Sequence, residues 1–288
     1  MSFRITEAFV QQYRDNVIHL SQQKGSRLRD TIRSETVTGK SYYFERIGPT
    51  QARRRMVRHG TIQIANTPHT RRRVDLFDWE WADLVDDLDK VRLLISPESE
   101  YALSGAYAMG RTIDQVIVDS LIGPARAGTD GEEIIQFPAT QIIDGQGGLT
   151  VEKLIETKEK LDKAEVDPED QRFFLISSVQ LGNLLRSQQI ASADYNTVRA
   201  LVAGEVDSFM GFKFIRTEIL PVSGRGALKK RTCIAYAENG AGLAIGKDIT
   251  TKIAERVDLG HATQIYLTMA VGATRIEDSR VVAIQCEE

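Results

Sequence analysis

The chain has 288 residues, of which 42% are hydrophobic and 27% are charged, and its formal net charge at pH 7 is −3. This length and composition allow one compact body or two sub-domains, whereas a dedicated nucleic-acid-binding domain is usually strongly basic. No stretch approaches the roughly 18 apolar residues of a membrane-spanning helix, and the first residues form no hydrophobic signal segment, so we expect a protein made and kept in a cytoplasm.

The first predicted element is an amphipathic helix over Thr6 to Gln22. Its apolar residues are Phe9, Tyr13, Val17 and Leu20, which recur at near-helical spacing. Little positive charge lies on its polar face, so we expect it to pack on its own body or on a neighbouring copy rather than on a membrane surface.

The next region is predicted to be an extended hairpin that projects from the body. Two strand-like pieces, Ser41 to Ile47 and Thr61 to Ala65, are separated by polar and arginine-rich turns. Few residues between 36 and 73 can build a core, so we expect this region to lie outside the main body.

Two blocks of opposite charge adjoin in this part of the chain. Seven arginines occur without an acid: Arg53, Arg54, Arg55, Arg58, Arg71, Arg72 and Arg73. Seven acids then occur without a base: Asp75, Asp78, Glu80, Asp83, Asp86, Asp87 and Asp89. The blocks either neutralise each other locally as a solvated face, or the basic block of one copy contacts the acidic block of the next, head to tail. On the second interpretation the contact residues are all seven arginines with Asp83, Asp86, Asp87 and Asp89.

Two helices are predicted in the middle of the chain. Ser96-Pro97-Glu98 supplies a cap, a first-turn proline and an acid for a long helix that Gly123-Pro124 ends. Its apolar face is Ala102, Ala106, Met109, Ile113, Val116 or Ile117, and Leu121. A second helix is predicted from Thr150 to Val166, with Val151, Leu154, Ile155 and Leu161 as its apolar face.

The C-terminal half is predicted to be rich in strands. Phe173 to Ile176 is a continuous apolar run typical of a strand buried on both faces, and Ser177-Ser178 then caps a short helix. Further strands are expected at Phe212 to Arg216, Thr232 to Ala237, Gln264 to Val271 and Val281 to Gln285. This order lacks the regular strand–helix alternation of a doubly wound sheet, so the predicted fold class is α+β.

No catalytic, cofactor-binding or metal-ligating residue is predicted. Gly242 to Asp248 departs from a phosphate-binding loop at Ala241 and Asp248, so a turn is the preferred interpretation. Ser177 lacks the context of a nucleophile elbow, and the histidines and cysteines have no ligand spacing. These are His19, His59, His69 and His261, with Cys233 and Cys286 as two inert thiols.

The most informative stretch is SADYNTVRALVAGEVDSFMGFKFIRT, from Ser192 to Thr217. The chain resembles the major capsid proteins of tailed, podovirus-like bacteriophages. The resemblance lies in two segments, Ala193 to Glu205 and Gly211 to Pro221, and in the order of elements along nearly the whole chain. The resemblance implies the Hong Kong 97 type capsid fold. Its implied parts are an N-terminal arm (1–34), an extended loop (35–75), a peripheral domain (76–168, with a spine helix at 95–123), an axial domain (169–259) and a return to the peripheral domain (260–288).

The resemblance also implies a function. The chain would be a structural protein rather than an enzyme, assembling as hexamers and pentamers into the icosahedral head around double-stranded DNA, which it would contact without sequence specificity. Only residues 1–34 precede the hairpin, which suggests a separate scaffolding protein. A portal protein and a decoration protein are further expected partners, with no membrane. The expected location is the virion, after procapsid assembly in the bacterial host cytoplasm, and a covalent cross-link through Lys40 is not expected.

Two alternatives remain at this stage. An encapsulin-like nanocompartment has the same fold but encloses a protein cargo, so the contents of purified particles would distinguish it. A soluble enzyme or DNA-binding domain would instead stay a small oligomer, and its basic block would bind DNA at moderate salt.

Overall fold

The structure is a computed structural model that describes residues 22–56, 58, 62, 64–86, 97–186, 208–224 and 229–288. Within these residues it contains three α-helices and three β-sheets, which confirms the mixed α+β class. The helix expected over Thr6 to Gln22 lies outside the described residues except at its last position, and the segment Ala193 to Glu205 lies outside them entirely.

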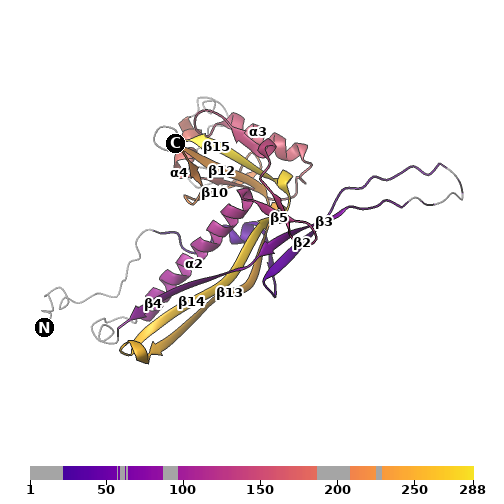
Figure 1. The fold of residues 1–288 in the computed structure, drawn as a ribbon. Helices are drawn as coiled ribbons and strands as arrows, with labels where there is room; N and C mark the ends of the chain where they lie inside the picture. Colours follow the sequence, from indigo (N-terminus) through magenta and orange to yellow (C-terminus); the bar gives the residue numbers. More distant parts are fainter. Residues whose placement is uncertain are drawn as a thin grey trace.

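The longest sheet forms an elongated layer along helix α2 (Figure 1). Its strand order is β1 (Arg33–Thr36), β13 (Ala241–Arg256), β14 (Ala262–Arg275) and β4 (Phe77–Val85). In β14 the odd-numbered residues Ile265 to Val271 are buried and the even-numbered ones are half-buried, which confirms the predicted period of two. The alternating pattern therefore marks the face that packs against the helix.

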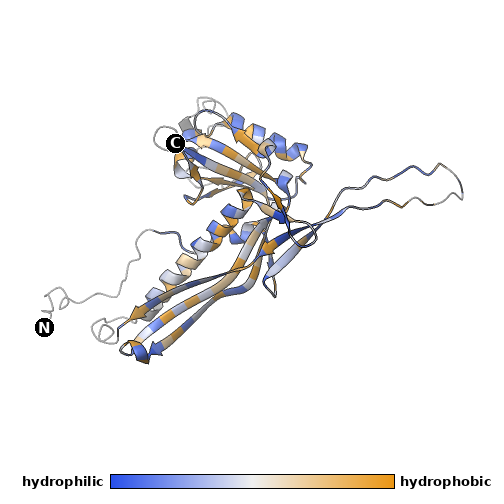
Figure 2. Ribbon diagram, viewed as in Figure 1, coloured by the Kyte–Doolittle hydropathy of each residue, from blue (hydrophilic) through white to orange (hydrophobic). Residues whose placement is uncertain are grey.

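Helix α2 (Pro97–Ile122) confirms the predicted long helix at both ends. Met109, Ile113, Ile117 and Leu121 are buried, and Ile117 rather than Val116 occupies the core position. Figure 2 shows apolar residues distributed along α2 and along the strands beside it. Burying each large apolar side chain on this face stabilises the fold by about 2 kcal/mol.

A second sheet builds the part of the molecule that carries α3 (Val151–Lys163) and α4 (Ser178–Arg186) (Figure 1). Its strand order is β7 (Ile142–Asp144), β15 (Val281–Glu287), β12 (Lys230–Ala237), β8 (Arg172–Ile176), β10 (Phe212–Arg216) and β9 (Ser208–Phe209), with β11 (Val222–Ser223) paired to β12. Every residue of β8 is buried, which confirms the predicted strand buried on both faces.

The third sheet holds the hairpin. Its strand order is β2 (Ser41–Ile47), β3 (His69–Asp75), β5 (Ala125–Ala127) and β6 (Glu133–Ile135). The first predicted hairpin strand is confirmed as β2, but the second was wrong. The described residues within Thr61 to Ala65 are not in a strand, and β2 instead pairs with β3, where an arginine-rich turn was expected.

Two further predictions were wrong. Gly242 to Asp248 is not a turn but part of β13, because Gly242 leaves room for the Phe44 ring and Gly246 for Leu76. In α3, Ile155 is 51% exposed, whereas Lys153 is buried because its Nζ donates to the carbonyl oxygens of Gly145, Gly147 and Gln285, each at 3.2 Å.

The implied domain boundaries remain a prediction, but strand pairing runs across them. β13 belongs to the segment assigned to the axial domain, yet it pairs with β14 of the assigned peripheral domain. β15, also assigned to the peripheral domain, pairs with β12 of the axial segment. Any division into two domains must therefore cut the chain more than once in its last third.

Other parts of the chain approach helix α2 closely at two of its glycines, Gly105 and Gly110. A Cβ atom at Gly105 would lie 2.6 Å from the Trp81 ring, and one at Gly110 would lie 2.5 Å from the carbonyl carbon of Gly25. The neighbour of Gly110 is backbone, which cannot rotate away as a side chain can. Substitution at Gly110 must therefore displace the chain entering the body.

We predict that Gly110→Ala lowers the free energy of unfolding by about 2 kcal/mol, because overpacking outweighs the gain of about 1 kcal/mol in helix propensity. Urea unfolding of the purified chain measures the change. Gly182→Ala in α4 is the matched control, since nothing lies within 4 Å of a Cβ there, and it should stabilise. Equal stabilisation by both substitutions would contradict the packing argument.

Candidate assembly surfaces

The chain between β2 and β3 projects away from the rest of the molecule (Figure 1). We call the described residues within 48–68 the projecting loop. The backbone N–H of Gly48 donates to the carbonyl of Pro68 at 2.9 Å, which closes its root. Met56, Ile62 and Ile64 are 83%, 87% and 86% exposed, which is unusual for three apolar side chains close in sequence. The loop therefore presents apolar surface that its own subunit leaves uncovered.

The seven arginines of the basic block divide into two groups. Four belong to the projecting loop and are exposed: Arg53, Arg54, Arg55 and Arg58. The other three lie in β3, where Arg71 is 3.5 Å from Glu45 and Arg73 is 2.7 Å from Asp75. Arg72 is only 1% exposed and pairs with Asp278 at 2.7 Å, so it is held inside its own subunit.

The acidic block lies largely on β4, which is an outer strand of the long sheet. Asp78, Glu80 and Asp86 are exposed and Asp83 is half-buried. Glu80 accepts a hydrogen bond from the Tyr266 hydroxyl at 2.9 Å, which raises the pKa of that tyrosine. Asp87 and Asp89 lie outside the described residues.

The two charged surfaces point in different directions within one subunit. Figure 1 shows the projecting loop extending from one side of the body, while β4 runs along the long sheet on the other side. Asp75 of the acidic block pairs with Arg73 of the basic block within the subunit, and it also lies 3.6 Å from Arg126. Adjacent in sequence, the loop arginines and the β4 acids are separated in space by the fold.

A buried carboxylate holds the chain that enters the body. Asp114, in the middle of α2, is fully buried and accepts hydrogen bonds from the backbone N–H groups of Arg27 and Leu28 at 3.0 to 3.1 Å. The Ser26 hydroxyl donates to it at 2.5 Å, and Gln23 donates through its amide. These donors satisfy the buried charge and fix the segment before β1 on the helix.

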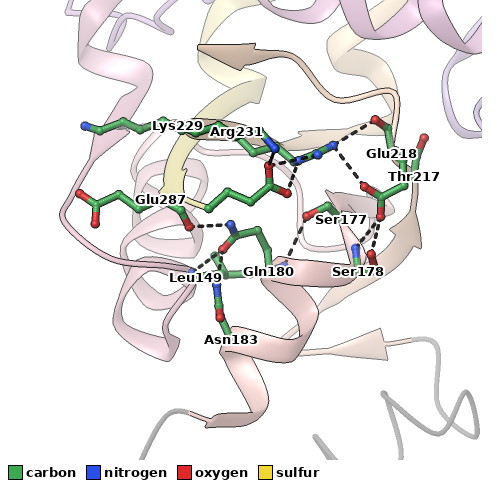
Figure 3. A network of polar contacts seen from close by, with 12 residues as sticks. Leu149, Ser177, Ser178, Gln180, Asn183, Thr217, Glu218, Lys229, Arg231 and Glu287 are labelled. Carbon is green, nitrogen blue, oxygen red and sulfur yellow. Dashed lines mark hydrogen bonds and ion pairs between the residues drawn. The ribbon is translucent and has the colours of Figure 1, made fainter. Parts of the chain in front are cut away.

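A polar network fixes the far end of the second sheet (Figure 3). The Arg231 guanidinium on β12 donates to both carboxylate oxygens of Glu288, at 2.8 and 3.2 Å, and to the Glu218 carbonyl at 3.0 Å. Lys229 lies 2.5 Å from the same Glu288 carboxylate. The Lys229 ammonium, together with Arg231, lowers the pKa of Glu288.

The same network gives Ser177 a structural role. Its buried Oγ accepts from the backbone N–H of Gln180 at 3.3 Å, which caps α4 as predicted. Gln180 in turn accepts from the Leu149 N–H at 2.9 Å and donates to the Glu287 carbonyl at 2.9 Å. The Ser177 hydroxyl thus caps α4, and the Gln180 side chain joins this helix to β15.

The other residues considered for chemistry are dispersed or buried. Cys233 and Cys286 are distant in sequence, but the structure places them on adjacent strands, where their hydrogen bond and burial raise the pKa of Cys233. Among the described residues, no group of three His, Cys, Asp or Glu side chains could hold a metal ion. No helix in the described part of the chain is long and apolar enough to cross a membrane.

The chain resembles known proteins over nearly its whole length. The model of the family described as phage capsid protein matches residues 5–288. The capsid of cyanophage P-SCSP1u has a TM-score of 0.75 at 14% identity, covering 100% of this chain and 96% of that chain. The capsid of Ralstonia phage GP4 has a TM-score of 0.74 at 11% identity, covering 100% and 98%.

A relative known by sequence matches only a part of the chain. An uncharacterized protein of Bradyrhizobium diazoefficiens is 37% identical over 95 residues. This match covers 31% of the present chain and 24% of that protein. The chain thus spans about a quarter of that relative's length.

The fold is the Hong Kong 97 type capsid fold, as the two phage structures show. The chain belongs to the phage capsid protein family, and its function is that of a major capsid subunit of the virion. The family match favours this function over an encapsulin-like shell. It points to a structural rather than an enzymatic role, in which copies associate with one another.

The buried charges leave little signal in the sequence. Four charged side chains hold distant segments together: Asp114, Arg231, Arg275 and Asp278. In most of these contacts the partner lies from 57 to more than 100 residues away in the sequence. An isolated acid on the apolar side of a predicted helix was the one available signal, at Asp114. The exposed charge blocks were visible because each is continuous in sequence.

We predict that Glu288→Gln lowers the free energy of unfolding at pH 7 by about 2 kcal/mol, because it removes a buried charge-assisted contact. Since the pKa of Glu288 is lowered in the folded state, its contribution is present above the ordinary value of 4.5 and is lost as the pH falls through the folded pKa. Denaturant unfolding of both proteins from neutral to acidic pH measures this.

The difference between wild type and Glu288→Gln should therefore shrink below about pH 5. Glu159→Gln is the control, because Glu159 forms an exposed helix pair with Lys163 that contributes about 0.4 kcal/mol. A difference for Glu288→Gln that persisted unchanged at pH 3 would show that charge is not what stabilises the network.

Proposed function

We propose that copies of this subunit assemble by placing the projecting loop of one copy along strand β4 of a neighbour. The observation that carries the proposal is the separation of the two charged surfaces. Arg53, Arg54, Arg55 and Arg58 lie on the loop, whereas Asp78, Glu80, Asp83 and Asp86 lie on or just after β4. Because the loop points away from β4 of its own subunit (Figure 1), the opposite charges meet most readily between copies.

The backbone of β4 supports the same contact. Among the described residues β4 is the last strand in the order of its sheet, so none of them occupies its outer N–H and C=O groups as a paired strand. An extended chain that carries basic residues can pair with such an edge, while its charges meet the acids of β4. Exposed Met56, Ile62 and Ile64 would then lose contact with water, which contributes roughly 25 cal/mol per Å² of buried apolar area.

The contact is heterologous, since a loop meets a strand rather than another loop. Repetition of such a contact closes rings when the rotation between copies allows it. Hexamers and pentamers are the rings that this proposal requires, and together they would build an icosahedral head. Each interface is modest, but the many copies in a shell multiply its effect.

The wider assembly is proposed from the family. The head would enclose double-stranded DNA, bound weakly through backbone phosphates and therefore in a salt-dependent manner. A separate scaffolding protein would guide procapsid assembly in the host cytoplasm, with a portal protein and a decoration protein as further components. Lys40, exposed before β2, would remain unlinked, so the shell would be held by non-covalent contacts.

We predict that replacing Arg53, Arg54 and Arg55 together with Glu abolishes shell assembly and leaves the folded subunit intact, because these side chains lie outside the body. Negative-stain electron microscopy measures assembly, with the scaffold co-expressed if one is required, and circular dichroism measures folding. The triple Arg→Lys variant is the control for charge and should still assemble. Wild-type shells from the triple Glu variant would remove the loop arginines from the interface.

A charge exchange tests the partner surface. Adding Asp78→Arg, Asp83→Arg and Asp86→Arg to the triple Glu variant restores opposite charges across the proposed contact. We expect at least partial recovery of assembly, whereas the Arg substitutions alone should impair it. The proposed contact would be contradicted if the triple Glu variant and the triple Arg variant both fail to assemble and the combined variant does not recover. The loop would then bind another surface.

A further inference from the structure

Three arginines converge where the hairpin sheet meets the body. Arg46 comes from β2, Arg72 from β3 and Arg275 from the end of β14. The guanidinium groups of Arg46 and Arg72 both donate to the carbonyl of Ile276, at 2.8 and 3.3 Å. Arg72 and Arg275 also bind the two oxygens of Asp278, at 2.7 and 2.6 Å. This cluster joins the root of the projecting loop to the rest of the subunit.

The positive charge of this cluster exceeds its negative charge. Asp278 is its one carboxylate, and no ion pair joins Arg46 to an acid among the described residues. Burial lowers the pKa of Arg72, and the neighbouring Arg46 and Arg275 lower it further against the opposing effect of Asp278. Two buried nitrogen atoms, Arg46 Nε and Arg72 Nη1, have no hydrogen-bond partner in the described part of the chain. Such donors are costly to leave unsatisfied.

A pocket of about 320 Å³ opens beside this cluster. Arg46 lines it, and so do Thr70 and Ala127, which are the direct cross-strand neighbours of Arg46 and Arg72. Directly paired residues lie on the same face of a sheet, so the buried Arg72 lies on the face that also carries Ala127 of the pocket lining. The remaining lining residues include His69 and Arg71, and the acids Glu45 and Glu133. Glu45 is 3.5 Å from Arg71, whereas Glu133 is exposed.

We propose that this pocket binds a small oxyanion, with phosphate as the model ligand. The anion accepts hydrogen bonds from Arg46 and offsets the excess positive charge of the cluster, in which Arg72 and Arg275 share the carboxylate of Asp278. Chloride is a weaker ligand, because it lacks the several oxygen acceptors that match a guanidinium. Occupancy would fix β2 and β3 on the turn after β14, and with them the direction of the projecting loop. The proposal depends on contacts within one subunit and is independent of where the loop binds a neighbour.

Thermal unfolding of the unassembled full chain tests the site. At phosphate ten times above its dissociation constant, we expect a melting temperature about 3 °C above that in chloride of equal ionic strength. Arg46→Gln should lose this increment, whatever its melting temperature in chloride. Arg126→Gln is the matched control, since Arg126 lies on the opposite face of the same sheet and is 53% exposed. It should keep the increment.

A second variant tests the electrostatics of the pocket. Glu133→Gln removes a negative charge from the pocket lining, which would repel the phosphate anion. This variant should bind phosphate more tightly and so have a lower half-saturating phosphate concentration. Hydrogen exchange gives a local readout, because phosphate should slow exchange of the β2 and β3 amides but not of α4. An equal melting temperature in phosphate and chloride, or an equal increment in wild type and Arg46→Gln, would overturn the proposal.

Discussion

Close packing of helix α2 against the long sheet and against the chain segment before β1 is the constraint on which the rest of the subunit depends. Gly105 allows Trp81 and Leu267 to approach the helix on one side, and Gly110 allows the backbone at Gly25 to approach it on another. Asp114 then fixes that backbone through charge-assisted hydrogen bonds. Because β4 is paired to β14 on the same layer, the acidic strand keeps a fixed position on the body. A rigid body is what repeated contacts between copies require.

The elements with a strong apolar period were predictable from sequence. Helix α2 and strand β14 each bury one face, so their periods of 3.6 and 2 residues survive in the chain. β3 could not be predicted in this way, because its two buried residues are Arg72 and Val74, and Val74 is the one apolar residue of the strand. The burial of Arg72 depends on Asp278, 206 residues later, which no local pattern reveals. The sequence therefore favours the more regular segment Thr61 to Ala65, whose described residues lie outside any strand.

Charged residues were predictable where they form continuous blocks in the sequence and were missed where they act singly. The loop arginines and the β4 acids are continuous blocks, and their charge was visible, although only the fold shows that they point apart. Lys153 and Asp114 are single charges within helices whose partners come from other elements. Their roles follow from tertiary contacts, as does the joint formed by Arg46, Arg72, Arg275 and Asp278. This subunit thus shows its exposed charges in the sequence more readily than the buried charges that hold its elements together.

The central claim is that the projecting loop of one copy lies on strand β4 of a neighbour. A cryo-electron microscopy map of the assembled shell at side-chain resolution tests this most directly. The account predicts density for Arg53, Arg54 and Arg55 beside Asp78 and Asp83 of the adjacent copy, with the loop backbone along the outer edge of β4. A map in which the loop contacts a different surface, or folds back on its own subunit, would contradict the account.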